Sequence, residues 1–298
     1  MEPRRLKKNS IKLFWTEASC WRKLALLRLL GVLKEDLAEK YLSKVLSLQN
    51  RDGGFARIEG EASSVKNTAE AIIYLIRSGK IPSLSIIQRA IDSLWNLQKN
   101  NGGWHENPKL SKEKIPFWSS SEKGVPILTA DSIEALVEAG YREDDRVLRA
   151  IDWLLSMQSP TGMWLSIEGA DPSDTEPDST QRAMSALINF GIPVSSQVIK
   201  KACAALEDFV MMEAEEWAKN YPPVWPWIAA LDGLIAADYT LENQVVQYSL
   251  NKILELQGED GGWPNRYELR VIPTLVALNF IPKEKAWKYI KMIEKDGG

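Results

Sequence analysis

Hydrophobic and polar positions repeat with a helical period along most of the chain. Apolar residues recur at spacings of three and four, as in the runs Ile87, Ile91, Leu94 and Val147, Ile151, Leu154. This spacing places the apolar side chains on one face of an α-helix and leaves the opposite face polar. We therefore predict amphipathic outer helices at 35–48, 84–97, 144–157, 241–256 and 282–295.

A second set of segments alternates with these helices and carries fewer charges. Because a helix that is apolar on most sides must be covered on most sides, these segments predict buried inner helices. They lie at 15–30, 68–76, 132–139, 179–190, 227–237 and 274–280. Pairing each inner helix with an outer one gives six helical hairpins, or twelve helices, if a sixth outer helix lies near 206–217.

A short motif follows four of the outer helices. It fits Gln-x-x-x-Gly-x-aromatic, begins at Gln49, Gln98, Gln158 and Gln257, and recurs at intervals of 49, 60 and 99 residues. The last interval leaves room for one unit without the motif. We expect the Gln amide to satisfy carbonyls at the end of its own helix, the glycines to allow a tight turn and the aromatic ring to stack on the neighbouring hairpin. The motif is thus interpreted as a structural clamp.

The starts of the inner helices also repeat. Asn67, Asp131 and Asp178 each stand three residues before a Glu or Gln, which is typical of a capping box. Pro226 and Pro273 occupy matching positions and are expected at the first position of their helices. Capping by itself therefore offers one explanation for Asp178.

Composition is typical of a globular protein with a sizeable core, since 45% of the 298 residues are hydrophobic and 26% are charged. A net charge of −3 argues against nucleic acid as a partner. The basic start of the chain at 1–12 is expected to be flexible, with contact to an anionic membrane as the alternative, and 13–298 to be a single domain. No apolar run reaches the length of a transmembrane helix. We expect a cytoplasmic protein, with peripheral membrane contact left open.

Few residues are available for histidine or thiol chemistry. His105 is the sole histidine, and Cys20 and Cys203 lie far apart. Zinc sites with several His or Cys ligands are therefore excluded, and a Ser-His-Asp triad would have to use His105. Glycine-rich phosphate loops are absent as well. We predict no metal and no cofactor. Tryptophan, in contrast, is unusually frequent, with twelve residues in the sequence.

The four Gln-Gly-aromatic segments and the inner helices between them resemble the prenyltransferase and squalene-cyclase repeat family. That family includes squalene-hopene cyclases, class II diterpene cyclases and the β-subunits of protein prenyltransferases. The resemblance extends from about Trp15 to Lys295. It implies an all-α fold, the (α/α)6 toroid, which is a double barrel of six helical hairpins. It also implies that an isoprenoid or another hydrophobic small molecule binds in the toroid cavity.

The family's cyclases carry their catalytic acid in an Asp-x-Asp-Asp-Thr motif at the start of an inner helix. The matching stretch here keeps the middle carboxylate as Asp178 and the final residue as Thr180, but it has Glu176 in place of the first Asp and Ser179 in place of the third. The resemblance implies that Asp178 protonates the substrate. Glu176 and Asp174 would keep a carboxyl group protonated, because neighbouring like charges disfavour ionisation.

Aromatic rings can stabilise a carbocation through their faces. On the predicted inner helices the candidates for substrate binding are Trp21, Tyr74, Trp225 and Trp227, with packing in the core as the alternative. The zinc ligands of protein prenyltransferases, Asp, Cys and His, find no match, since Cys203 falls on a predicted outer helix and His105 is distant in the sequence.

Three functions follow from these observations. The first is a minimal class II terpene cyclase, a terpenoid-related enzyme that protonates an isoprenoid chain. The second is a non-catalytic isoprenoid-binding or subunit-type toroid, and the third is a carbohydrate-active enzyme with two carboxylates flanking a glycosidic bond. Because cyclases of this family generally pair two such domains, the resemblance also implies a second domain or subunit in trans.

Overall fold

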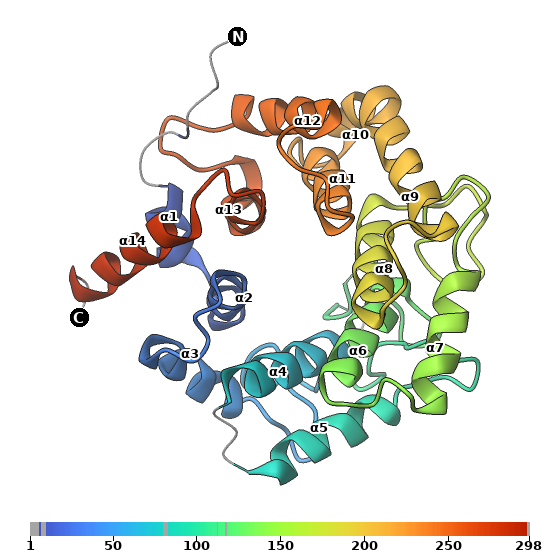
Figure 1. Cartoon of the computed structure of the whole chain (residues 1–298). Coiled ribbons are helices and arrows are strands. Elements are labelled where there is room, and N and C mark those ends of the chain that lie inside the picture. The colour runs from blue at the N-terminus through green and yellow to red at the C-terminus, as the bar shows by residue number, and fades with distance from the viewer. Residues whose placement is uncertain (1–5, 7–9, 80–82, 112, 117, 297–298) are drawn as a thin grey trace. The chain divides into compact units, whose positions relative to one another are not determined.

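The computed structural model describes residues 6, 10–79, 83–111, 113–116 and 118–296. The basic cluster Arg4, Arg5, Lys7 and Lys8 lies outside these residues. Over the described part of the chain, α-helices are joined by loops that contain only isolated β-bridges (Figure 1). The chain divides into two compact units: a terminal unit, Met1–Val32 with Cys203–Gly298, and a central unit, Leu33–Ala202.

Outer and inner helices alternate in the central unit, as the sequence predicts. The outer helices are α3 (Asp36–Leu46), α5 (Leu84–Trp95) and α7 (Asp145–Ser156), and the inner helices are α4 (Val65–Ser78), α6 (Pro126–Glu138) and α8 (Pro177–Phe190). The inner helices form one row, in which α6 packs against both α4 and α8 (Figure 1). α5 packs on α4 and α7 on α6. α6 is buried on nearly every side, and its buried residues include the acidic Asp131 and Glu134.

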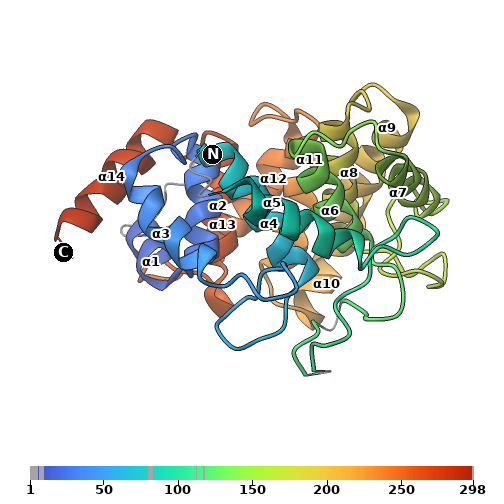
Figure 2. The ribbon, with the colours of Figure 1, turned by 90° about the horizontal axis from the view of Figure 1, so that it is seen from below.

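The terminal unit brings the two ends of the chain together. Its helices are α1 (Ser10–Glu17), α2 (Cys20–Leu30), α10 (Ala214–Asn220), α11 (Trp225–Ala236), α12 (Gln244–Glu255), α13 (Glu268–Ala277) and α14 (Lys283–Asp296), with a π-helical turn η1 (Phe209–Glu213) and a 3-10 turn η2 (Pro264–Arg266). α9 (Gln197–Asp208) extends across the boundary between the units. α1 and α2 pack against α13 and α14, and Figures 1 and 2 show these four helices side by side.

Two predicted helices differ in the structure. The segment expected as one helix at 15–30 is two, because α1 ends at Glu17 and Ser19 caps α2 by accepting a hydrogen bond from the backbone N–H of Arg22. α1 itself begins at Ser10. The outer helix expected near 206–217 is found as the end of α9, the turn η1 and α10.

The glutamine of the motif clamps one loop to the next outer helix. Gln98 Nε2 donates to the carbonyl of Gly102 at 3.1 Å and to that of Arg146, at the start of α7, at 2.9 Å. Gln49 and Gln158 make the equivalent pair of bonds. The prediction that the amide satisfies its own helix is wrong, because an indole N–H reaches that helix instead. Trp104 Nε1 donates to the carbonyl of Leu94 at 2.7 Å.

The inner helices of the central unit begin earlier than predicted. α4, α6 and α8 start at Val65, Pro126 and Pro177, so Asn67, Asp131 and Asp178 lie inside the helices. The capping prediction for these three residues is wrong.

A threonine at the fourth helical position anchors each of these starts instead. The hydroxyl oxygen of Thr129 accepts a hydrogen bond from the backbone N–H of Trp104 at 2.9 Å. Thr68 and Thr180 accept in the same way from Phe55 and Trp164. The threonine therefore ties each inner helix to the aromatic residue of the preceding motif.

The two matching prolines occupy different positions. Pro226 is the second residue of α11, one position after the predicted first, whereas Pro273 lies inside α13. The prediction for Pro273 is wrong because α13 already begins at Glu268, directly after the turn η2.

Candidate active site

The candidate acid lies at the start of α8 in the central unit. Glu176 precedes the helix in an extended conformation and Asp178 is its second residue. The backbone of Glu176 is fixed from two sides, since its N–H donates to the carbonyl of Trp164 at 3.1 Å and its carbonyl accepts from the hydroxyl of Thr180 at 2.8 Å. These bonds hold the two carboxyl-bearing residues at a defined place on the inner helix.

Glu176 is the carboxyl group whose protonation is most affected. Burial, together with the nearby charges of Asp178 and Asp174, raises its pKa from 4.5 to about 7. Asp174 is exposed, and its carboxylate accepts a hydrogen bond from the hydroxyl of Ser166 at 3.0 Å. Asp178 and Asp174, the other two carboxyl groups expected from the sequence, are thus close enough to Glu176 to affect its ionisation.

The raised pKa makes the stability of the fold depend on pH. Between pH 4.5 and about 7 the folded chain holds a proton on Glu176 that the unfolded chain has released, so this group's contribution to stability is complete below pH 4.5 and falls as the pH rises to about 7. We expect Glu176→Gln to become more stable relative to the wild type across this window. Urea unfolding at pH 4.5, 5.5, 7 and 8 measures the difference.

The matched control for this experiment is Glu59→Gln, at an exposed position of the same unit. The free energy of unfolding of this variant should vary with pH in the same way as that of the wild type. If the Glu176→Gln curve is also parallel to the wild type, Glu176 does not hold a proton in the folded chain at neutral pH.

A buried ion pair lies beside this cluster. Arg182 is one turn after Asp178 on α8, and therefore on the same face of the helix, and it pairs with Asp131 of α6. The side chain of Asp131 is 1% exposed, and its carboxylate oxygens have no well-formed hydrogen-bond partner. Because a buried carboxylate needs a compensating charge, the contact with Arg182 accounts for Asp131. Sequence reasoning missed this pair, for which the only signal was an arginine on a helix expected to be buried.

The four candidate aromatic residues are divided between the units. Tyr74 on α4 is buried in the central unit together with the carboxyl cluster, whereas Trp21 on α2, Trp225 and Trp227 on α11 belong to the terminal unit. Trp227 makes an edge contact with Tyr248 of the outer helix α12, with ring centroids 5.9 Å apart. Trp225 stacks on Trp217 of α10 at 5.3 Å.

Metal ligands are scarce in the described part of the chain. There, no group of three or more His, Cys, Asp or Glu residues is arranged to hold a metal ion. Cys203 lies on α9, and burial raises the pKa of its thiol to about 11, which keeps it protonated at neutral pH. His105 Nδ1 contacts the carbonyl of Glu106 at 2.8 Å. Among the described helices, none is long and apolar enough to cross a membrane.

The structure is all-α, with inner and outer helices that alternate and are joined by Gln-Gly-aromatic clamps, and this fold is shared with type II terpene cyclases. The solved type II terpene cyclase MstE from Scytonema has the same (α/α)6 toroid fold. It superposes with a TM-score of 0.62 at 17% identity, over 86% of this chain and 80% of that one. The six-hairpin fold class predicted from the sequence is therefore confirmed.

The family can be stated more narrowly. The model of the squalene-hopene cyclase C-terminal domain matches residues 22–172, half of the chain, and the chain belongs to this family. The lanosterol synthase erg7A of Aspergillus fumigatus is 39% identical over 84 residues, which is 28% of this chain and 11% of that protein. The drimenyl diphosphate synthase of Streptantibioticus cattleyicolor is 39% identical over 71 residues, which is 24% of this chain and 12% of that protein.

These matches cover only about a ninth of the length of the curated relatives. The family match also ends before the carboxyl cluster at Asp174 to Asp178. The family match and the solved structures together point to a class II terpene cyclase fold, and neither comparison favours the non-catalytic or the carbohydrate-active alternative.

Proposed function

We propose that this chain starts the cyclisation of an isoprenoid chain by protonating an alkene, with Asp178 as the proton donor. The observation that carries the proposal is the carboxyl cluster at the start of α8, where Glu176 has a pKa of about 7 beside Asp178. The substrate class is supported by MstE, one variant of which was solved with geranylgeranyl dihydroxybenzoate as its substrate.

The position of Asp178 supports a chemical role over a capping role. The residue in the capping position of α8 is Glu176, and its side chain makes no capping hydrogen bond. Asp178 lies beyond the cap, in the first turn, where Pro177 already fixes the start of the helix. Capping therefore does not explain a carboxyl group at this position.

The proton balance of the reaction assigns a role to each carboxyl group. The proton of Asp178 adds to the terminal double bond and leaves a tertiary cation, which the next double bond attacks to close a ring. The last cation loses a proton to a water molecule, which ends the reaction, and the carboxyl groups regain a proton from the solvent. In this proposal Glu176, with a pKa of about 7, returns a proton to Asp178, and the charge of Asp174 disfavours ionisation of Glu176.

Buried aromatic rings would stabilise the cation during ring closure. We retain Trp21, Tyr74, Trp225 and Trp227 as the candidate contacts with the isoprenoid chain. We also infer that a second domain or subunit in trans completes the enzyme, because the curated relatives are much longer than the segments that match. The reaction is assigned to the cytoplasm, with a peripheral membrane contact supplying the hydrophobic substrate.

The test is product formation in deuterated water. The purified chain is incubated with geranylgeranyl diphosphate, squalene or 2,3-oxidosqualene, and the products are identified by mass spectrometry. We expect a cyclic product from at least one substrate, with one deuterium added at the protonated carbon. A cyclic product without deuterium, or tight substrate binding without any cyclic product, contradicts protonation-initiated cyclisation by this chain.

A further inference from the structure

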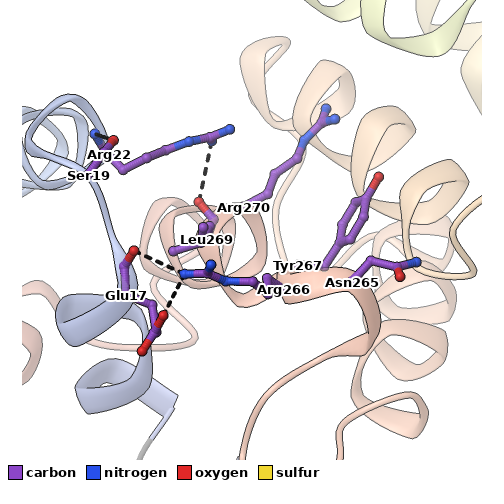
Figure 3. A pocket seen from close by; sticks show the side chains of 8 residues that line it. All are labelled: Glu17, Ser19, Arg22, Asn265, Arg266, Tyr267, Leu269 and Arg270. Atoms are coloured by element: carbon purple, nitrogen blue, oxygen red, sulfur yellow. Dashed lines mark hydrogen bonds and ion pairs between the residues drawn. The ribbon is translucent and has the colours of Figure 1, made fainter. Parts of the chain in front are cut away.

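A pocket of about 540 Å³ lies in the terminal unit, between the start of α2 and the start of α13 (Figure 3). Its volume is within the range of small-molecule sites. The polar lining comprises Glu17, Ser19, Arg22, Asn265, Arg266, Tyr267 and Arg270. We call this site the arginine pocket, because three guanidinium groups face a single carboxylate.

Two of the three guanidinium charges are already compensated. Arg266 donates to the carboxylate of Glu17 at 2.6 Å, and Arg270 pairs with Asp232 of α11 at 3.3 Å. Asp232 does not line the pocket, and its other carboxylate oxygen accepts a hydrogen bond from Thr274 at 2.6 Å. The carboxylates therefore hold these two arginines in place but leave the third without a counter-charge.

Arg22 is that third arginine. Its guanidinium donates only to the backbone carbonyl of Leu269, at 3.5 Å, and it has no carboxylate partner among the described residues. The carbonyl is accessible for a physical reason: Pro273, four residues later in α13, has no N–H to donate to it. Figure 3 shows Arg22 and Arg270 reaching over the same side of the pocket.

The loop that closes the pocket is held in an unusual conformation. Asn265 and Arg266 have φ angles of 57° and 60°, in the left-handed region that residues with a side chain rarely adopt. This turn carries the Arg266 side chain to Glu17 at the edge of the pocket. Consecutive residues in this region need a compensating interaction, and the ion pair supplies one.

We propose that the arginine pocket binds a phosphate or diphosphate group. A guanidinium presents a planar fork of donors that matches two oxygens of a phosphate, and such bonds are stronger than those between neutral groups. Arg22 and Arg270 supply the donors, and the uncompensated charge of Arg22 supplies the attraction. The proposal goes beyond the cyclase function and uses none of the carboxyl groups of α8.

Calorimetric titration with inorganic diphosphate at low ionic strength tests the pocket. We expect Arg22→Gln to weaken binding at least about tenfold, as is usual for the loss of a charged hydrogen bond. The matched control is Lys12→Gln, which removes the same charge from an exposed position on α1 outside the pocket, and its affinity should change less than about twofold. The proposal is overturned if the wild type does not bind diphosphate, or if Arg22→Gln binds it as tightly as the wild type does.

Further titrations identify the source of the group and separate this proposal from the cyclase function. Farnesyl diphosphate binding more tightly than inorganic diphosphate, with the same loss in Arg22→Gln, identifies a prenyl diphosphate head group. Equal affinities identify a soluble phosphorylated compound. Acetate binding as tightly as diphosphate overturns the phosphate assignment. Asp178→Asn should bind diphosphate as the wild type does, whether or not the wild type forms a cyclic product.

Discussion

Replacing Asp178 by Asn is expected to lower the rate of cyclisation about a thousandfold, within the range that a positioned general acid contributes. Asn has nearly the shape of Asp but no acidic proton, so the fold of α8 should persist while the first step fails. Single-turnover product formation, measured by mass spectrometry, gives the rate. The thermal unfolding midpoint checks that the variant is folded.

The control is Asp145→Asn, which makes the same change in the first turn of the outer helix α7. It should leave the rate unchanged. A wild-type rate in Asp178→Asn contradicts the assignment of Asp178 as the donor. If Glu176→Gln loses the activity in that case, the donor is Glu176.

Replacing Gly102 by Ala should reduce the free energy of unfolding by about 3 kcal/mol or more. Its φ of 104° is strained for alanine, and the added Cβ would lie 2.4 Å from the backbone carbonyl oxygen of Arg149 in α7. Left-handed strain costs about 1–2 kcal/mol and overpacking a further 1–3 kcal/mol. Because the oxygen that the new Cβ approaches belongs to the backbone of α7, it cannot rotate away as a side chain could. Urea unfolding measures the loss.

Gly140 provides a control for the strain alone. Its φ is 91°, but nothing lies within 4 Å of a Cβ built there. Gly140→Ala should therefore lose only about 1–2 kcal/mol. Equal losses in the two variants contradict the close approach of the Gly102 loop to α7.

The helices and their alternation could be predicted because the signal is local. A period of three and four residues marks α5 and α7, and low charge marks α11, whatever the rest of the chain does. The starts of the inner helices could not be placed in this way. Asn67 and Asp131 fit a capping pattern, but the actual anchor joins Thr68 and Thr129 to aromatic residues 13 and 25 positions away.

The candidate sites likewise divide into one that has a local signal in the sequence and others that do not. Asp178, Glu176 and Asp174 can be found from the sequence because they lie within five residues of one another in one loop and helix start, and the charges of Asp178 and Asp174 do raise the pKa of Glu176. The ion pair of Arg182 with Asp131 joins two helices, and the contact of Arg22 with Leu269 joins residues 247 positions apart. Such pairings depend on how helices pack and leave no periodic trace in the sequence.

The motif that begins at Gln257 limits the order in which the chain can fold. Gln257 donates to the hydroxyl of Ser10 at 2.7 Å, and these residues are 247 positions apart. The central unit is made of consecutive residues and can form during synthesis, as units of a growing chain generally do. α1, in contrast, cannot make its contact with Gln257 until the last motif has been synthesised. Closing so long a loop is slow, which makes assembly of the terminal unit the expected late step of folding.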